Sequence, residues 1–142
     1  HWHAMGKPTL SLGKGATGAT MEFAVNSLFP GLTQTLAEAV TRAEAAGIAS
    51  EAAFDVIEAS AACAPMLKYL RPLYLDEASH DVTFTVALAR KDMELAAKLA
   101  RDLGTAMPQG LTTLKKLREA EARGYTNRDM ASILSFMREE RS

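Results

Sequence analysis

The chain has 142 residues, a formal net charge of −1 and 48% hydrophobic residues, which fits one domain with a substantial core. Its 16 basic and 17 acidic side chains nearly cancel, so charge gives no support for binding to nucleic acid or to an anionic membrane. A single cysteine, Cys63, excludes an internal disulfide and is typical of a reducing compartment, so a cytoplasmic protein is expected. No uncharged apolar run approaches the roughly 20 residues that span a bilayer.

The beginning of the chain carries a glycine motif. Residues 1–5, HWHAM, resemble a tag remnant and are excluded from the fold prediction. Residues 8–12, PTLSL, are compatible with one short strand, and residues 13–18 then match the dinucleotide fingerprint G-x-G-x-x-G. That fingerprint requires a second parallel strand within about 30 residues, and helical sequence follows instead. The sequence therefore favours a glycine-rich turn over a phosphate-binding loop.

The first helix is expected to be long. The chain after the turn is rich in Ala, Leu, Glu, Lys, Arg and Met, which favour helices. A helix is expected from Thr17 to Ala46, with Gly47 as the residue that stops it and a kink at Pro30. Apolar residues recur along it at three- and four-residue steps and form one stripe. The stripe consists of Met21, Val25, Leu28, Leu32, Leu36 and Val40.

Two shorter helices are expected next. Ser50 is predicted to N-cap a second helix over residues 51–61, and a proline opens a short helix over residues 65–69. Residues 70–82 contain Pro72 and show no clear period, so a loop is expected there. The residues of the second helix that are predicted to face inward are Phe54, Val56, Ile57 and Ala61.

Three more helices complete the prediction. One is expected over residues 84–103, ending at Gly104, and another opens at Pro108 and closes at Gly124. Thr126 to Asp129 is a capping-box variant that predicts a last helix over residues 127–139. The expected fold class is all-α, with five or six helices and one strand at the front edge.

Two motifs carry a family resemblance. Residues 16–26 read ATGATMEFAVN, where a known family has G-x-G-x-x-x-K-x-x-x-N; the residues that match are Gly18 and Asn26, and Glu22 stands at the lysine. Residues 84–93 read FTVALARKDM and match the same family's F-x-L-x-L-x-x-K-D-L. The chain resembles the C-terminal helical domain of the β-hydroxyacid dehydrogenase superfamily, which includes 3-hydroxyisobutyrate and 6-phosphogluconate dehydrogenases.

The resemblance implies the domain organisation. Residues 6–15 would end an N-terminal Rossmann domain, and residues 16–142 would form a helical domain of the 6-phosphogluconate dehydrogenase C-terminal type. The expected cofactor is NAD or NADP, bound mainly by the Rossmann domain. The expected partners are that domain, a second copy paired through the helical domain, and a small hydroxy-acid substrate. This chain alone is expected to be inactive, like half an enzyme.

The resemblance also implies the site. Glu22, at the lysine position, and Asn26, one helical turn further on, would face the substrate as catalytic residues. Lys91 and Phe84 would face the cofactor near its nicotinamide, with Asp92 beside them. No residues are predicted to bind a metal.

Glutamate at the lysine position leaves three alternatives open. An ionised glutamate accepts a proton from a hydroxyl but repels a substrate carboxylate, whereas a protonated one donates to a carbonyl or imine nitrogen. Imine reductases of this superfamily also lack the lysine, so an imine-reductase-like enzyme with Glu22 as proton donor is one alternative. A second is a non-catalytic helical dimerisation module. The third is that Glu22 is only a solvated charge near a helix N-terminus.

Overall fold

The computed structural model describes residues 16–141, and within that range the chain is helical. The only strand-like pairing among these residues is an isolated antiparallel bridge between Thr85 and Asp129. The elements are α1 Ala16–Ala45, α2 Ser50–Ala59, α3 Pro65–Tyr69, α4 Arg71–Leu75, η2 Glu77–Ser79, α5 Val86–Leu103, α6 Pro108–Ala122, η3 Met130–Ser132 and α7 Ile133–Glu139. The all-α prediction is confirmed, while the strand and glycine motif of residues 8–18 lie largely outside the described residues.

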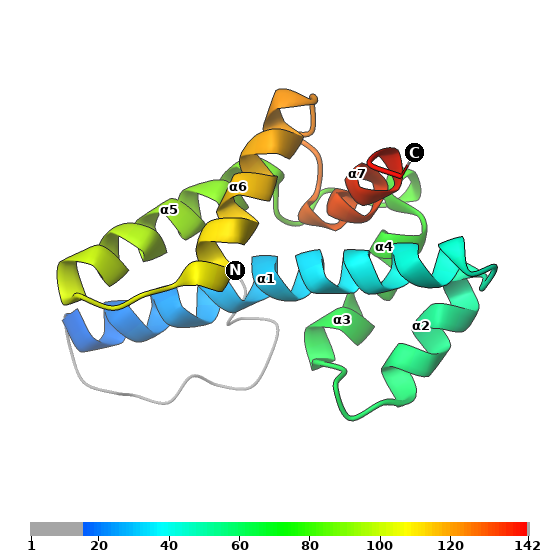
Figure 1. The fold of residues 1–142 in the computed structure, drawn as a ribbon, viewed down its shortest axis with the longest axis horizontal. Helices are drawn as coiled ribbons and strands as arrows, with labels where there is room; N and C mark the ends of the chain where they lie inside the picture. Colours follow the sequence, from blue (N-terminus) through cyan, green and yellow to red (C-terminus); the bar gives the residue numbers. More distant parts are fainter. Residues whose placement is uncertain (1–15, 142) are drawn as a thin grey trace.

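The long helix α1 is the axis of the fold. It has 30 residues and passes through Pro30 without interruption, within one residue of both predicted ends. Its first half lies beside α5, which runs in the opposite direction, and its second half lies beside α7, with α2 to α4 on another side (Figure 1). No helix among residues 16–141 is long and apolar enough to cross a membrane.

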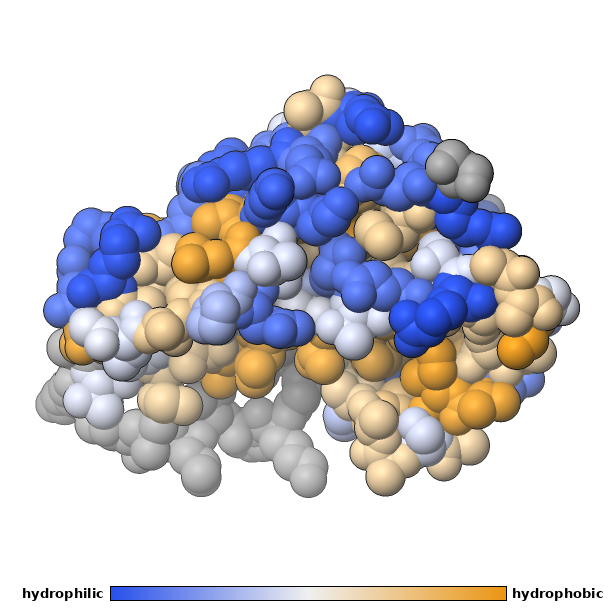
Figure 2. Space-filling model, viewed as in Figure 1, coloured by the Kyte–Doolittle hydropathy of each residue, from blue (hydrophilic) through white to orange (hydrophobic). Residues whose placement is uncertain are grey.

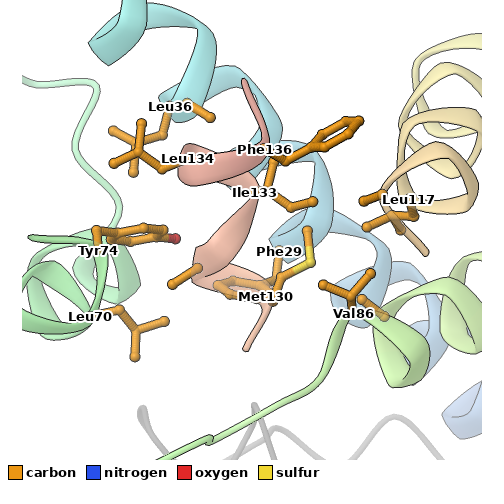
Figure 3. Packing of buried hydrophobic residues seen from close by; sticks show 14 of the residues in the cluster. Phe29, Leu36, Leu70, Tyr74, Val86, Leu117, Met130, Ile133, Leu134 and Phe136 are labelled. Atoms are coloured by element: carbon orange, nitrogen blue, oxygen red, sulfur yellow. The ribbon is translucent and has the colours of Figure 1, made fainter. Parts of the chain in front are cut away.

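The core forms where α1, α4, α5, α6 and the C-terminal segment meet. Figure 3 shows Phe29 of α1 beside Met130 and Val86, with Leu117 of α6 to their right. Aromatic rings link the elements, because Phe29 packs edge-on against Phe84 with ring centroids 6.4 Å apart. Full burial of such a side chain contributes roughly 1.5–3 kcal/mol, so this cluster holds the helices around α1.

Three glycines end helices as predicted. Gly47, Gly104 and Gly124 follow α1, α5 and α6 with φ angles of 89°, 71° and 94°. Backbone in this left-handed region is strained for residues with a Cβ, which explains why glycine occupies each position.

The prediction for α2 was wrong in three details. Ala49 precedes the helix without a side-chain cap, because the Ser50 hydroxyl donates its hydrogen bond to Glu44 instead. The helix also ends at Ala59, so Ala61 lies beyond it. Val56 is 71% exposed, although Phe54 is buried and Ile57 is half-buried, as expected.

Residues 70–82 are more ordered than predicted. Pro72 lies in the first turn of α4, where backbone N–H groups have no acceptor within the helix. A proline there costs no helical hydrogen bond, so it opens a helix rather than interrupting one. A short 3-10 helix, η2, follows directly. The expected loop is therefore restricted to the residues just before Thr83.

Two helix starts also differ from the prediction. Thr85 N-caps α5, with its Oγ1 accepting a hydrogen bond from the Leu88 N–H at 3.1 Å, so the helix begins at Val86 rather than at residue 84. The last helix does not begin at residue 127. Asp129 caps η3 by accepting from the Ala131 N–H at 2.9 Å, and α7 follows only at Ile133.

The apolar stripe of α1 divides into two halves. Leu36 and Val40 lie in the core, whereas Met21, Val25 and Leu28 are 43%, 45% and 62% exposed. Figure 2 shows hydrophilic side chains gathered over α6 and α7, and apolar ones on the side where α2 and α3 lie. The first half of α1 therefore presents an apolar face that the described residues leave uncovered.

Candidate functional site

The first half of α1 carries the two predicted catalytic residues. Glu22 is exposed, and Asn26 follows one helical turn later on the same face. Asn26 is only 4% exposed, and its Oδ1 has no hydrogen-bond partner among the described residues. Buried side-chain oxygens normally accept a hydrogen bond, so this unpaired atom marks the face as a place to look for a ligand.

Asp92 faces this region from α5. It is half-buried, and its Oδ2 is buried without a hydrogen-bond partner in the described part of the chain. Burial raises the pKa of Asp92, the negative charge of Glu22 raises it further, and Lys91 lowers it by a smaller amount. The two carboxyl groups therefore lie close enough across the α1–α5 contact for their charges to repel.

The two predicted cofactor residues lie in different environments. Lys91 is exposed on α5, next to Asp92 in the chain. Phe84 is 8% exposed, and its ring packs against Phe29 in the core. The charge of Glu22 thus acts on Asp92 across the α1–α5 contact, while the Phe84 ring contributes to the core packing.

Asp129 supports the segment before α5, although the sequence pattern predicts only a local capping role for it. Its Oδ2 accepts hydrogen bonds from the Thr83 N–H and Oγ1 at 2.7 and 2.9 Å and from the Phe84 N–H at 3.3 Å. The Met130 N–H also donates to the Phe84 carbonyl at 2.7 Å. These contacts join segments more than 40 residues apart, and the T-x-x-D pattern contains no signal for them.

A cavity of about 190 Å³ opens between the first half of α1 and the second half of α5. Its walls are mostly apolar and include Phe23, Ala24, Ala96 and Leu103, with Thr20 and Ser27 as polar members. Sites for drug-sized ligands are usually about 300–1,000 Å³, so this hollow is the size of a small fragment. The sequence analysis did not predict it, because it depends on how two distant helices pack.

Known proteins share this sequence and fold. Residues 16–137 match the family described as NAD-binding of NADP-dependent 3-hydroxyisobutyrate dehydrogenase. Glyoxylate/succinic semialdehyde reductase 1 of Arabidopsis thaliana is 24% identical over 134 residues, which are 94% of this chain and 46% of that protein. The chloroplastic reductase 2 of the same plant is 23% identical over 138 residues, which are 97% of this chain and 38% of that protein.

A solved structure agrees in fold. The crystal structure of 3-hydroxyisobutyrate dehydrogenase from Salmonella typhimurium aligns with a TM-score of 0.77 and 24% identity, over 84% of this chain and 41% of that one. The chain therefore spans less than half the length of each of these relatives.

Proposed function

The chain belongs to the family of NAD-binding domains of NADP-dependent 3-hydroxyisobutyrate dehydrogenase, and from that premise we propose that it is the C-terminal domain of an NAD(P)-dependent 3-hydroxyacid dehydrogenase-like oxidoreductase. The family match also confirms NAD or NADP as the expected cofactor. In this proposal the domain supplies the substrate pocket and the dimer contacts and is inactive alone. The observation that supports it is the contact between α1, which carries Glu22 and Asn26, and α5, which carries Asp92, with Asn26 Oδ1 and Asp92 Oδ2 both buried and unpaired among the described residues.

Each residue then has a defined task. Glu22 accepts or donates the proton of the reacting oxygen, because its exposed carboxyl reaches beyond the helix surface. Asn26 holds the substrate by its free oxygen, and Asp92 is available as a second hydrogen-bonding group. The substrate class in this proposal is a small hydroxy acid or the corresponding carbonyl compound.

The cofactor fits this face in part. Lys91 is exposed and therefore available to the cofactor, whereas Phe84 is buried and packs against Phe29 in the core. When bound, the nicotinamide supplies the hydride transfer. The chain's own residues hold the substrate and manage its proton.

The proposal includes a homodimer through α1. Met21, Val25 and Leu28 form the exposed part of its stripe, and pairing with a second copy would remove this area from water. Leu28→Glu should therefore shift the chain from dimer to monomer in sizing chromatography at micromolar concentration. Val56→Glu is the matched control, since Val56 is also an exposed apolar residue, at 71% against 62% for Leu28, but lies on α2. A monomeric parent chain would refute this part.

A second candidate is an imine-reductase-like enzyme with Glu22 as proton donor. The observation that favours it is a second carboxyl group on α5, because burial and the negative charge of Glu22 raise the pKa of Asp92 and favour its protonated, proton-donating form. A non-catalytic dimerisation module remains as the alternative if neither activity is found.

The decisive experiment uses the whole protein that contains this domain. It is assayed with NAD(P)⁺ and a panel of small hydroxy acids, and with NAD(P)H and imines, beside Glu22→Lys and Glu22→Gln variants. Oxidation of a hydroxy acid by the parent supports the proposal. Turnover by Glu22→Lys alone would mean that glutamate has inactivated the site. Imine reduction that Glu22→Gln abolishes would favour the second candidate.

A further inference from the structure

Two neighbouring cavities lie around the end of α5. The first is the cavity of about 190 Å³ between α1 and α5, and the second, of about 250 Å³, lies between the end of α5 and the start of α6. The two adjoin, because three residues line both of them. These residues are Ala100, Thr105 and Met107. Together the cavities reach the roughly 300–1,000 Å³ that is usual for a small-molecule site, which neither reaches alone.

Met107 forms the most adaptable part of the shared wall. It is half-buried, and its methyl group fills the space that the missing side chain of Gly110 leaves, since a Cβ at residue 110 would overlap that methyl group. A methionine side chain is unbranched and changes conformation easily. Rotation of this one side chain would therefore widen the passage between the two cavities.

The walls of both cavities are mainly apolar and carry one charge. Among the described residues, no acidic side chain lines either cavity, and the one charged side chain on the walls is that of Arg101. Within residues 16–141 no ion pair engages Arg101, and its acidic neighbour Asp102 pairs with Lys98 at 2.8 Å. The guanidinium group is therefore available to an anion that enters the second cavity.

Thr105 supplies a second polar group beside Arg101. Its hydroxyl donates only a long hydrogen bond, of 3.4 Å, to the Ala100 carbonyl. A carboxylate is a better acceptor than this carbonyl, because hydrogen bonds to charged groups are shorter and stronger. The polar groups of the walls thus favour an anion, and the rest of the walls favours a hydrocarbon chain.

We propose that the two cavities together bind a small carboxylate with an unbranched hydrocarbon chain. The chain lies along the apolar walls past Met107, and the carboxylate meets the Arg101 guanidinium and the Thr105 hydroxyl. A cationic amine would meet a like charge at Arg101, and a peptide segment would bring main-chain polar groups against apolar walls. Glu22 and Asn26 line neither cavity, so this inference does not depend on the proposed function.

The test follows the methionine methyl groups of the full chain by NMR while octanoate is added. We expect a saturable shift of the Met107 signal, and no shift of Met66, which lies on α3 and lines neither cavity. Acetate has the same charge without the chain, and octylammonium has the same chain with the opposite charge. Each should bind roughly tenfold more weakly than octanoate, or less tightly still.

Variants assign the effect to the walls. Arg101→Gln should weaken octanoate binding roughly tenfold, since a hydrogen bond between two charged groups is replaced by one from a neutral amide, whereas Arg101→Lys keeps the charge and most of the affinity. Ala100→Phe fills space that both cavities share and should abolish binding. Arg123→Gln is the matched control, because this exposed arginine lies at the other end of α6 and lines neither cavity.

Four outcomes would overturn the proposal. The first three are the absence of a saturable Met107 shift with octanoate, equally tight binding of octylammonium, and unchanged octanoate binding in Arg101→Gln. The fourth is a Met107 shift that follows protein concentration without any ligand, which would assign these cavities to a second copy of the chain.

Discussion

Replacement of Asp129 by alanine tests whether one buried carboxylate holds the start of α5 to the C-terminal segment. Asp129 is 1% exposed and accepts four hydrogen bonds, from two main-chain N–H groups near Phe84, from the Thr83 hydroxyl and from the Ala131 N–H. Because the Phe84 ring packs against Phe29 of α1, this carboxylate also helps to hold the segment before α5 against α1.

The expected loss follows from the groups left behind. Alanine leaves the Ala131 N–H buried without an acceptor and removes the Asp129 acceptor from the Phe84 N–H, at roughly 1–3 kcal/mol each, whereas the Thr83 groups can turn to water. We expect Asp129→Ala to lower the free energy of unfolding by about 3–5 kcal/mol, a large part of the 5–15 kcal/mol typical of a domain. Asp129→Asn keeps one acceptor oxygen and should lose about half as much.

Urea denaturation followed by circular dichroism measures both values. Asp81→Asn is the control, since Asp81 is an exposed acid in the same segment and its replacement should change stability by less than about 0.5 kcal/mol. A loss below about 1 kcal/mol for Asp129→Ala, with an unchanged urea slope, would refute the role assigned to Asp129.

Three further changes test other parts of the fold. Burial raises the pKa of Tyr74 above 10.0, so its hydroxyl loses the proton more easily in the unfolded chain than in the folded one. The free energy of unfolding therefore falls as pH rises past about 10. Tyr74→Phe should reduce that fall in a series of urea denaturations between about pH 8 and 11. The hydrogen bond from Arg138 lowers the pKa of Glu44 below 4.5. This bond to the ionised carboxylate contributes about 1–2 kcal/mol to the free energy of unfolding above that pH, and the contribution is lost in acid. Glu44→Gln should therefore flatten the acid side of the curve of stability against pH. Gly124→Ala should cost about 1–2 kcal/mol because its φ is +94°, whereas Gly31→Ala, inside α1 with open space around it, should be neutral or stabilising in the same assay.

The helical fold could be predicted from the sequence where the signal is local. The glycines at 47, 104 and 124 ended helices as expected, because a left-handed residue is required there whatever the rest of the chain does. Ser50 shows the limit of such signals. The local sequence predicts that its hydroxyl caps α2. In the folded chain Glu44 lies within reach, and the Ser50 hydroxyl donates its hydrogen bond to that carboxylate instead.

In the candidate site, too, the local features could be predicted from the sequence and the long-range contacts could not. The i,i+4 spacing of Glu22 and Asn26 is a local property of α1 and could be predicted directly. The approach of Asp92 depends on how α5 packs along α1, and the sequence indicated it only through the family motif. The bonds from Asp129 to Thr83 and Phe84 have no sequence signal, because they join chain segments that meet only in the folded state.

The charge at position 22 has a physical consequence that does not depend on the reaction. A lysine there would pair with Asp92, lower its pKa and leave the α1–α5 contact close to neutral. Glu22 reverses that sign, because its negative charge raises the pKa of Asp92, and Lys91 lowers that pKa by a smaller amount. In the substrate site that we propose, the glutamate at position 22 therefore reverses the charge that a bound carboxylate would meet.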